Sequence, residues 1–406
     1  MPSIIDPSAG ATPAHAARAS LQVDTTGEPT RVALVGAHGF GAMYLRRIAD
    51  LVHKGVVDLR AVADPRPADA LGAAPPDVPW YSSLDELLAT EDATPDVVVL
   101  STPLPTHLSL AEKALRAGCD VLLEKPPTVS MAEHERLVAI VEETGRRCQV
   151  GFQTFGSNVF AEIDRVVASG EIGEVTGIGA VGTWVRTAGY WGRAPWAGRR
   201  RLEGVEVVDG VVTNPLAHAV ATALRVGGVT RACDVDAVET DLYRANPIEA
   251  DDTSSIRVVS ADGRSFGFGL TLCAPERSPA RVLVQGARGD LTLFYESDRI
   301  EVRTPDGEWS LQSDRTDLLA DLLMARRDPA AKLRCDVRDT GAFMRVLEAV
   351  RTAPDPALIA SSHVTWHGED TERRPVVKDI EVWCEQAART QSTFTTLGAP
   401  WARTRH

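Results

Sequence analysis

The sequence predicts an α/β fold, in which a doubly wound parallel sheet is followed by a second α/β domain with a mainly antiparallel sheet. Three observations lead to this prediction. Between residues 31 and 152, short apolar runs alternate with amphipathic stretches of helical length, as in consecutive βαβ units. After residue 153 the chain is rich in β-forming runs separated by turn signals such as Asp262-Gly263. The length of 406 residues also exceeds what one core usually holds.

In the first region, the pattern predicts that each strand leads into a helix or loop and then into the next strand. The expected strands are 31–36, 57–64, 96–103, 120–126 and 147–153, and the expected helices are 41–55, 84–91, 107–118 and 131–145. Ser83 with Glu86, and Ser130 with Glu133, form capping boxes that predict the starts of two of these helices.

In the second region, the pattern predicts a sheet with a few helices around it. The expected strands are 174–185, 237–245, 254–260, 265–272, 281–286, 290–295 and 299–303. The expected helices are 159–170, 215–228, 317–328, 339–353 and 378–390.

Charge and cysteine usage narrow the function classes. The net charge of −13 argues against nucleic acid or an anionic membrane as a partner, and the one basic cluster, 199–201, is expected to be a solvated loop rather than a phosphate-binding patch. The six cysteines are scattered without metal-ligand spacing, so we expect reduced thiols in a cytoplasmic protein and no metal site. No apolar stretch approaches the ~18 residues of a membrane span. The first thirty residues lack the apolar core of a signal peptide.

A glycine-rich turn, "GAHGFG", joins the first strand to the first helix. A dinucleotide fingerprint has glycines at positions one, three and six, which allow a pyrophosphate to approach the helix N-terminus. Gly36 and Gly41 match the first and last of these positions, whereas His38 stands at the second and Gly39 is displaced by one. The match is therefore partial.

Asp64 strengthens the dinucleotide interpretation, because it ends the second strand and could bind a ribose 2′-hydroxyl. A carboxylate there would repel a 2′-phosphate, so NAD is favoured as the cofactor. Arg66 follows two residues later and leaves NADP open. The loop "STPLPTH" (101–107) and the stretch "EKPP" (124–127) follow two further strands, so both should line the same crevice at the carboxyl edge of the sheet.

Together these motifs resemble those of the Gfo/Idh/MocA oxidoreductases. The resemblance is carried by "GAHGFG", "AVADP", "DVVVLSTPLPTHLSLAEKALRAGCDVLLEKP", "VGFQTF", "NPLAH" and "VQGARGDLTL", over roughly residues 31–350. It implies an N-terminal Rossmann domain, a C-terminal domain with a large open sheet that commonly serves as an oligomer interface, and NAD(P)-dependent oxidation of a hydroxyl on a sugar, polyol or similar molecule. The cofactor-binding residues expected from the fingerprint and the strand-end loops are Gly36, His38, Gly39, Phe40, Gly41, Asp64, Ser101, Thr102, Pro103, His107, Glu124 and Lys125.

The pattern changes and the resemblance together predict four segments. Residues 1–30 are expected to be a disordered tail, 31–152 the dinucleotide-binding domain, 153–355 the substrate-binding and oligomerisation domain, and 356–406 a C-terminal helical extension. We expect a homodimer or homotetramer formed through the open sheet.

The resemblance also assigns catalytic residues. Lys125 falls on the family's catalytic lysine, Glu124 on the acid before it, and His218 on the histidine of a D-x-x-x-H motif. A hydride can leave a carbinol carbon only if the hydroxyl proton also leaves, so a cation and a base must meet the oxygen. Lys125 is suited to the first task and His218 to the second. The resemblance further suggests that the Lys125–Pro126 bond is cis.

The motif departs from the family at Asn214, where an aspartate is usual. Asparagine can orient the imidazole of His218 but cannot stabilise its charged form. Three explanations remain open, in this order: Lys125 carries the proton transfer, the enzyme works mainly in the reductive direction, or Asp209 supplies the missing charge. The last is weakened by the position of Asp209 beside Gly210, at a bend that is usually glycine-rich in the family.

The segment 183–210 holds Trp184, Tyr190, Trp191 and Trp196 interleaved with arginines. Aromatic rings stack on sugar C–H faces and arginines bind hydroxyls or carboxylates, so Tyr190, Arg193 and Trp196 are expected to contact substrate together with Lys125, Asn214 and His218. The alternative is a hydrophobic plug or an oligomer interface.

Three functions are compatible with these features. The first is a sugar, glycoside or cyclitol dehydrogenase, and the second is a glycoside hydrolase or lyase that keeps its NAD through an oxidation–elimination–reduction cycle. The third is a cofactor-sensing or structural protein without turnover, which Glu124, Lys125 and His218 argue against.

Overall fold

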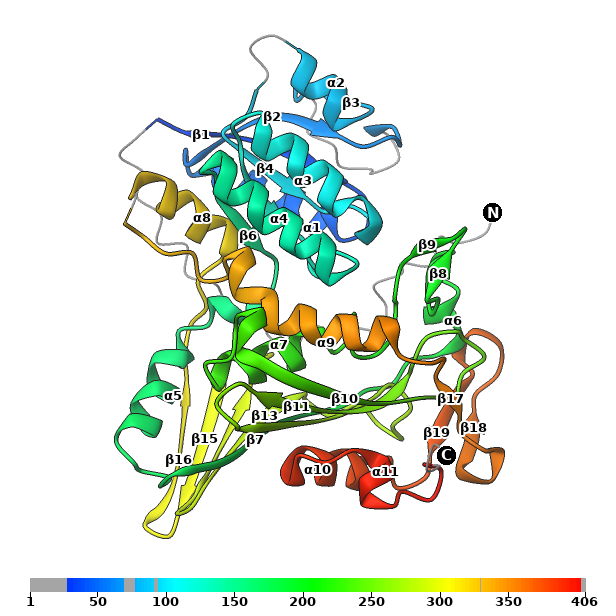
Figure 1. The fold of residues 1–406 in the computed structure, drawn as a ribbon. Helices are drawn as coiled ribbons and strands as arrows, with labels where there is room; N and C mark the ends of the chain where they lie inside the picture. Colours follow the sequence, from blue (N-terminus) through cyan, green and yellow to red (C-terminus); the bar gives the residue numbers. More distant parts are fainter. Residues whose placement is uncertain (1–27, 69–76, 91–93, 329, 403–406) are drawn as a thin grey trace. The chain divides into compact units, whose positions relative to one another are not determined.

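The computed structural model describes residues 28–68, 77–90, 94–328 and 330–402 (Figure 1). Their contacts form two compact units. The N-terminal unit contains the described residues of 28–156 and 316–341, and the C-terminal unit those of 157–315 and 342–402. The segment 316–341, expected in the second domain, thus packs with the first. Most of the predicted N-terminal tail lies outside the described residues.

A parallel sheet of six strands forms the centre of the N-terminal unit, in the order β3-β2-β1-β4-β5-β6. The order reverses beside β1, which is the switch point of a doubly wound fold. The strands are β1 (Thr30–Val35), β2 (Val57–Ala63), β3 (Trp80–Tyr81), β4 (Val97–Leu100), β5 (Asp120–Leu123) and β6 (Cys148–Val150). All residues of β4 and β5 are buried, as expected for strands covered on both faces. The predicted parallel sheet is confirmed, although 101–103 and 124–126 are loops rather than strand ends.

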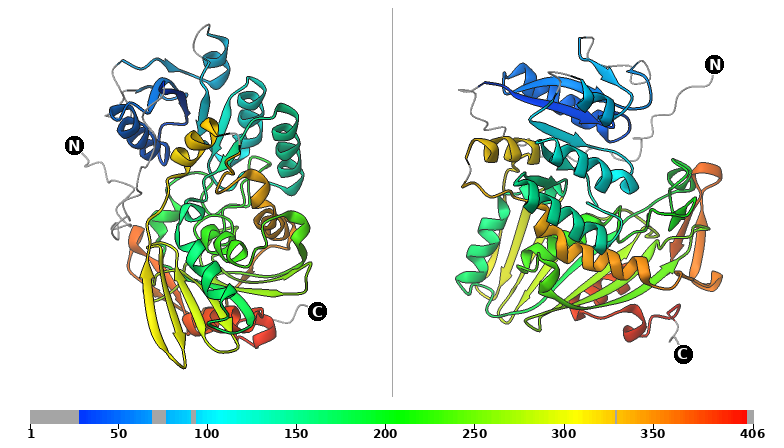
Figure 2. Two further views of the ribbon diagram at one scale, coloured as in Figure 1. Left: turned by 90° about the vertical axis from the view of Figure 1, so that its left-hand side faces the viewer. Right: turned by 45° about the horizontal axis from the view of Figure 1, so that its top comes forward.

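Helices cover both faces of this sheet, and Figure 2 shows α1 on the side opposite to α3 and α4. The helices are α1 (Gly41–His53), α2 (Leu84–Ala89), α3 (His107–Arg116), α4 (Met131–Thr144) and α8 (Leu318–Arg327), with short 3₁₀ turns η2 (Leu104–Thr106), η3 (Gln153–Gly156) and η5 (Val337–Thr340).

The two predicted capping boxes are half formed. Ser83 and Ser130 accept hydrogen bonds from the backbone N–H groups of Glu86 and Glu133, as predicted. The return bonds differ, because each glutamate accepts from the backbone one residue before the capping serine.

Helix α8 belongs to the N-terminal unit because buried polar groups attach it to the parallel sheet. The amide of Gln149, on β6, donates to the carbonyl of Leu318 at 3.1 Å and to Asp321 Oδ2 at 2.7 Å. Arg326 pairs with Asp120 of β5 at 2.6 Å. Since Asp120 and Gln149 are both buried, losing the helix would leave them without these partners.

The C-terminal unit is built on a nine-stranded sheet in the order β16-β15-β14-β13-β7-β12-β11-β10-β17. Only β7–β12 and β10–β17 pair in parallel, which confirms the prediction of a large, mainly antiparallel sheet. The strands are β7 (Val175–Thr183), β10 (Val235–Arg244), β11 (Thr253–Ser260), β12 (Ser265–Thr271), β13 (Arg281–Gly286), β14 (Asp290–Phe294), β15 (Arg299–Thr304), β16 (Gly307–Gln312) and β17 (Ala357–Leu358).

The remaining elements lie around this sheet. The helices are α5 (Val159–Ala168), α6 (Ala188–Trp191), α7 (Ala217–Val226), α9 (Gly341–Thr352), α10 (Ile380–Thr390) and α11 (Phe394–Leu397), with the 3₁₀ turns η4 (Ala232–Asp234), η6 (Ser361–His363) and η7 (Asp370–Glu372). Two small hairpins are β8 (Arg201–Leu202) with β9 (Val205–Glu206), and β18 (Val364–His367) with β19 (Arg374–Val377). The predicted helical extension after residue 356 is therefore only partly helical.

Helices pack on both faces of the large sheet, with α7 on one side and α10 on the other (Figure 1). The backbone of α10 comes unusually close to β7 and β12. A Cβ atom on Gly179 would lie 2.4 Å from the carbonyl oxygen of Ala388, and one on Gly269 would lie 2.2 Å from that of Cys384. Glycine is thus required where the helix crosses the centre of the sheet.

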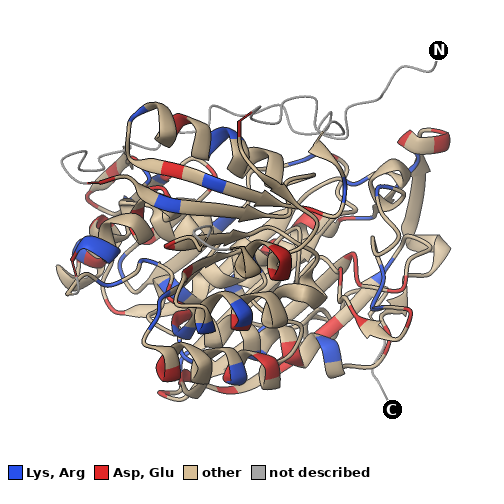
Figure 3. Cartoon of the chain, turned by 90° about the horizontal axis from the view of Figure 1, so that it is seen from above, with Lys and Arg blue, Asp and Glu red and all other residues tan. Residues whose placement is uncertain are grey.

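Charged residues of both signs are interspersed along the chain (Figure 3). All six cysteines are free thiols, and only Cys233 is exposed. No helix in the described part of the chain is long and apolar enough to cross a membrane. Within 28–402, apart from the undescribed gaps, no three His, Cys, Asp or Glu side chains are grouped as a metal ion would require.

Candidate functional site

Loops that follow neighbouring strands meet at the carboxyl edge of the parallel sheet. The backbone N–H of Gly36 donates to Ala63 at 2.8 Å, that of Ser101 to Val35 at 2.9 Å, and that of Glu124 to Leu100 at 2.9 Å. These bonds continue the ladder beyond the strands, so the fingerprint turn, the loop 101–107 and the stretch 124–127 lie side by side, as predicted.

The fingerprint turn is too tight for side chains at two of its positions. A Cβ atom on Gly41 would lie 1.9 Å from the carbonyl oxygen of Gly36, and one on Gly36 would lie 2.3 Å from that of Ser101. Around Gly39, in contrast, a Cβ atom would meet nothing within 4 Å. The turn leads directly into α1, whose first N–H groups can bind an anion. Phe40, at the N-cap, is exposed. The turn therefore fits the pyrophosphate of a dinucleotide.

Asp64 is buried beneath protein hydrogen-bond donors. Its carboxylate accepts from the ring Nδ1 of His38 and the backbone N–H of Ala37, both at 2.9 Å, and from Nε of Arg66 at 3.2 Å. Burial opposes ionisation, but the hydrogen bonds from His38 and Arg66 outweigh it and hold the pKa of Asp64 well below its usual value. His38, at the second glycine position of the fingerprint, thus hydrogen-bonds to Asp64, the acid that was predicted to bind the ribose.

Glu124 lies in a closed polar niche after β5. The hydroxyl of Tyr44, on α1, donates to Glu124 Oε1 at 2.5 Å, and the amide of Gln153 approaches the same oxygen at 3.4 Å. The backbone N–H of Lys125 donates to Oε2 at 3.1 Å. Burial raises the pKa of Glu124, although Tyr44 and the charge of Lys125 oppose that rise. Glu124 therefore supports its neighbours from within the protein.

Lys125 is partly exposed at the same edge, and its bond to Pro126 is cis. His107 joins this stretch to the preceding loop: its Nδ1 lies 2.9 Å from the carbonyl oxygen of Pro126, and its Nε2 lies 2.9 Å from that of Thr102. Burial lowers the pKa of His107, and the contacts with the backbone carbonyls oppose that shift. His107 is fully buried, which makes it a brace between the two loops.

The remaining residues of the loop 101–107 are arranged around a short turn. Ser101 and Thr102 are partly exposed, Pro103 is exposed, and the hydroxyl of Thr106 donates to that of Thr102 at 2.8 Å. These side chains lie at the edge where the fingerprint turn ends.

In the C-terminal unit, His218 and Asn214 stand out by their exposure. Within the segment 211–224, which includes most of α7, only Asn214, Pro215 and His218 are partly exposed, and every other residue is buried. Asn214 lies in the turn before α7, and His218 is the second residue of that helix. The two predicted catalytic residues therefore form the accessible part of an otherwise buried segment.

Asp209 holds Asn214 in place. The amide Nδ2 of Asn214 donates to Asp209 Oδ1 at 2.6 Å, while Oδ2 pairs with Arg193 at 3.0 Å and accepts the backbone N–H of Gly198 at 2.8 Å. The preceding residue, Val208, has φ +45°, a conformation that is costly for a β-branched side chain. Sequence reasoning ranked Asp209 last of three explanations, and its only signal was its place five residues before Asn214.

The predicted substrate-contact residues form one stack. The guanidinium of Arg193 lies 3.7 Å from the ring centre of Tyr190 and 4.6 Å from that of Trp196. Because Arg193 also pairs with Asp209, its charge is offset inside the protein. Arg186, one of the arginines interleaved with these aromatic residues in sequence, lies 4.7 Å from the ring centre of the same Tyr190.

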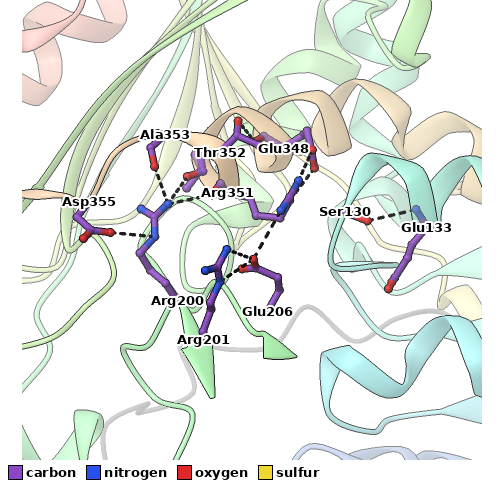
Figure 4. A network of polar contacts seen from close by, with 11 residues as sticks. Ser130, Glu133, Arg200, Arg201, Glu206, Glu348, Arg351, Thr352, Ala353 and Asp355 are labelled. Carbon is purple, nitrogen blue, oxygen red and sulfur yellow. Dashed lines mark hydrogen bonds and ion pairs between the residues drawn. The ribbon is translucent and has the colours of Figure 1, made fainter. Parts of the chain in front are cut away.

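Each arginine of the basic cluster 199–201 has partners within the protein, and Figure 4 shows those of Arg200 and Arg201. Arg199 pairs with Glu249 at 2.6 Å, and Arg201 with Glu206 at 2.7 Å. Arg200 donates to the carbonyl groups of Val350, Arg351 and Ala353 at the end of α9, where orphan acceptors need donors. Arg200 thus attaches the segment that carries the aromatic stack to the end of α9.

Comparison with known proteins agrees with this description of the N-terminal unit. Residues 30–152 match the model of the Gfo/Idh/MocA oxidoreductase family, NAD-binding Rossmann fold. The scyllo-inositol 2-dehydrogenase (NAD(+)) of Bacillus subtilis is 37% identical over 95 residues, which are 23% of this chain and 27% of that protein. The inositol 2-dehydrogenase of Leifsonia xyli is 32% identical over 152 residues, 37% of this chain and 44% of that protein. The matches thus span less than half of these relatives, and they confirm the resemblance for the Rossmann region.

Solved structures extend the likeness in fold to most of the chain. An oxidoreductase domain protein from Kribbella flavida has a TM-score of 0.67 at 20% identity, over 80% of this chain and 97% of that one. The WlbA dehydrogenase from Bordetella pertussis, solved in complex with NADH and UDP-GlcNAcA, has a TM-score of 0.65 at 21% identity, over 79% and 95% of the two chains. At these identities the likeness supports the two-part fold alone.

Proposed function

We propose that this chain, whose residues 30–152 carry the NAD-binding Rossmann fold of the Gfo/Idh/MocA oxidoreductases, is an NAD(P)-dependent dehydrogenase acting on a hydroxyl of a sugar, glycoside or cyclitol. The main support is the position of Glu124 and Lys125, directly after β5 and beside the fingerprint turn of the same sheet edge. A buried acid followed by a partly exposed lysine at this edge is what oxidation of a bound carbinol requires.

The cofactor would be held by the chain's own donors at this edge. The open side of the turn at Gly39 and the N-terminus of α1 suit the pyrophosphate, and Ser101, Thr102 and Pro103 suit the groups beyond it. When bound, the nicotinamide supplies the hydride acceptor. NAD is proposed as the main cofactor, and Arg66 beside Asp64 leaves NADP possible.

Lys125 would stabilise the oxygen from which the proton leaves. The donors on Glu124, the hydroxyl of Tyr44 and the backbone N–H of Lys125, keep this acid in its niche directly before Lys125. A cation placed where negative charge develops lowers the barrier for alkoxide formation.

His218 would accept the proton, with Asn214 as the residue that positions the site. The bond from Asn214 Nδ2 to Asp209 fixes which side of the amide carries the donor, so the carbonyl oxygen of Asn214 faces the other way as an acceptor. This arrangement supports the explanation in which Asp209 compensates for the missing aspartate, although Arg193 shares its charge. Lys125 and His218 belong to different units.

The substrate class rests on the named relatives, two of which are inositol dehydrogenases. The second candidate, a glycoside hydrolase or lyase that retains NAD, is kept because Asn214 makes His218 a weaker base than the usual pair. The free thiols are consistent with a reducing cytoplasm. A homo-oligomer remains our expectation, but α10 already covers the centre of one sheet face, so the contact would involve strands outside it.

The test is to incubate the full chain with NAD or NADP and a panel of sugars, glycosides and cyclitols, following reduced nicotinamide and released products. Net reduction of the cofactor with a ketone product supports the dehydrogenase. Product release without net reduction favours the hydrolase or lyase, and cofactor binding without turnover over the whole panel would overturn both.

A further inference from the structure

Arg186 is the least compensated charge in the aromatic stack of the C-terminal unit. It lies between β7 and α6, where its backbone N–H donates to Leu272 at 3.0 Å. Its guanidinium lies 5.1 Å from the ring centre of Trp184 and 4.7 Å from that of Tyr190. Two aromatic faces thus hold the planar group in one orientation.

Among the described residues, no carboxylate lies within ion-pair distance of Arg186. The neighbouring arginines differ in this respect, because Arg193 pairs with Asp209 at 3.0 Å and Arg277 pairs with Glu296 at 2.7 Å. The hydrogen bond given by Arg186 Nη1 goes to the carbonyl of Val185 at 2.9 Å. Its Nε is buried and has no partner in the described part of the chain.

The surroundings make an additional anion favourable. Arg277 lies 4.8 Å from the ring of Trp184, the same ring that Arg186 approaches. Arg374 donates to the carbonyl groups of Ala274 and Pro275, in the loop that carries Arg277. Burial lowers the pKa of Arg186, the hydroxyl of Tyr190 opposes that shift, and the charges of Arg277 and Arg193 lower the pKa further. A partly buried cation without a counter-ion is costly, and the cost is relieved when a ligand brings one.

We propose that Arg186 binds an anionic oxygen group, a carboxylate or a phosphate, on the sugar or polyol substrate. The planar fork of an arginine matches both groups in a bidentate manner. That the anion belongs to the substrate rests on the proposed dehydrogenase function. The anion site itself rests on the geometry of Arg186. The proposal implies that the chain prefers acidic or phosphorylated sugars over neutral sugars as substrates.

The first experiment measures binding without turnover. The full chain is titrated with glucuronate, glucose 6-phosphate and glucose while its tryptophan fluorescence is followed, since Trp184 lies against Arg186. We expect one or both anions to bind at least about tenfold more tightly than glucose, because a hydrogen-bonded ion pair in a partly buried site has about that effect. Comparing glucuronate with glucose 6-phosphate shows which anion is preferred.

The variants separate this role from a structural one. Arg186→Met should weaken anion binding about 10- to 100-fold and leave glucose binding unchanged, while the melting temperature of the ligand-free protein stays the same or rises. Arg199→Met, which removes an exposed arginine paired with Glu249, is the matched control and should bind anions like the parent. If Arg186→Met is not recovered folded, Arg186→Lys should still lose several-fold in affinity, because it cannot form the bidentate contact.

Turnover assays distinguish failure of this proposal from failure of the proposed function. If the protein oxidises acidic sugars, Arg186→Met should raise the KM for these sugars and change kcat little, as expected for a group remote from the reacting carbon. If neutral sugars are oxidised and anionic sugars bind no more tightly than neutral ones, Arg186 is not an anion site and the dehydrogenase function stands. If anions bind through Arg186 but no sugar is oxidised, the anion site stands and the dehydrogenase function fails. Equal anion affinities for Arg186→Met and Arg199→Met would overturn the inference.

Discussion

Asn214 donates a 2.6 Å hydrogen bond to Asp209, which in turn pairs with Arg193 at 3.0 Å. A buried carboxylate therefore stands behind the asparagine that replaces the usual aspartate. The carboxylate of Asp209 is shared between Asn214 and Arg193. The orientation of Asn214, and through it the site around His218, should depend on Asp209.

Asp209→Asn tests this dependence. We expect kcat to fall roughly tenfold or more, because the amide of Asn214 loses its fixed acceptor. The free energy of unfolding should fall by about 3 kcal/mol, since Arg193 would be left without its partner. Urea denaturation and steady-state kinetics measure the two effects. Glu249→Gln, which breaks the exposed pair with Arg199, should cost less than about 1 kcal/mol; an Asp209→Asn variant with parental kcat would contradict the role given to Asp209.

Tyr44→Phe tests the niche of Glu124. Burial raises the pKa of Glu124 and the hydroxyl of Tyr44 opposes that rise, so the variant should raise this pKa further. A carboxyl whose folded pKa lies above its unfolded value of about 4.3 loses stability as pH rises between the two. Tyr44→Phe should therefore lose about 2 kcal/mol at pH 8 and less at pH 5 in urea titrations.

The matched control is Tyr295→Phe. The hydroxyl of Tyr295 is also buried, but it has no hydrogen-bond partner among the described residues. Its removal should leave stability unchanged or raise it at both pH values. Equal behaviour of the two variants would show that the contact between Tyr44 and Glu124 has no energetic weight.

His38→Gly restores the second glycine of the fingerprint and releases one oxygen of Asp64. That oxygen keeps the backbone N–H of Ala37 but loses the donor of the His38 side chain, so we expect NAD to bind several-fold more tightly and the preference for NAD over NADP to increase. Arg66→Ala, which removes the exposed cation beside Asp64, should weaken NADP more than NAD. Fluorescence titrations with NADH and NADPH measure both effects, and unchanged affinities in His38→Gly would mean that Asp64 does not contact the ribose.

Gly269→Ala tests the crossing of α10 over the large sheet. The added Cβ would lie 2.2 Å from the carbonyl oxygen of Cys384, which is backbone and cannot rotate away. We expect a loss of about 1–3 kcal/mol in thermal unfolding and faster proteolysis at α10. Gly192→Ala, whose nearest contact would be 3.7 Å, is the control and should unfold like the parent; a stable Gly269→Ala variant would argue that α10 is only loosely attached.

Much of the fold was predictable because long apolar runs and helical periodicity survive in any tertiary context. Three strands were not predictable. The strands β8 and β9 have two residues each, and β16 is mostly exposed, so none of the three carries an apolar pattern. The placement of α8 with the first unit depends on Gln149 and Asp120 meeting it in space, which chain order does not reveal.

The site was predictable where a motif defines it and not where pairing defines it. Gly36, Gly41, Glu124 and Lys125 could be selected from the sequence because each lies just after a strand or in the turn that follows one. The bond between His38 and Asp64 joins residues 26 apart in sequence, and the isolation of Arg186 becomes visible only once the partners of its neighbours are known. Both features arise from tertiary contacts rather than from local pattern.

In the proposed function, Lys125 carries the chemistry at the edge of the dinucleotide-binding sheet, and this role can be tested by a single substitution. It is tested most directly by Lys125→Ala, measured for turnover on the best substrate of the panel and for NADH binding by fluorescence. We expect turnover to fall at least about 1,000-fold, as when a stabilising group for the developing charge is removed, while the Kd for NADH changes less than about threefold. Turnover near the parental level with intact cofactor binding would contradict the assignment.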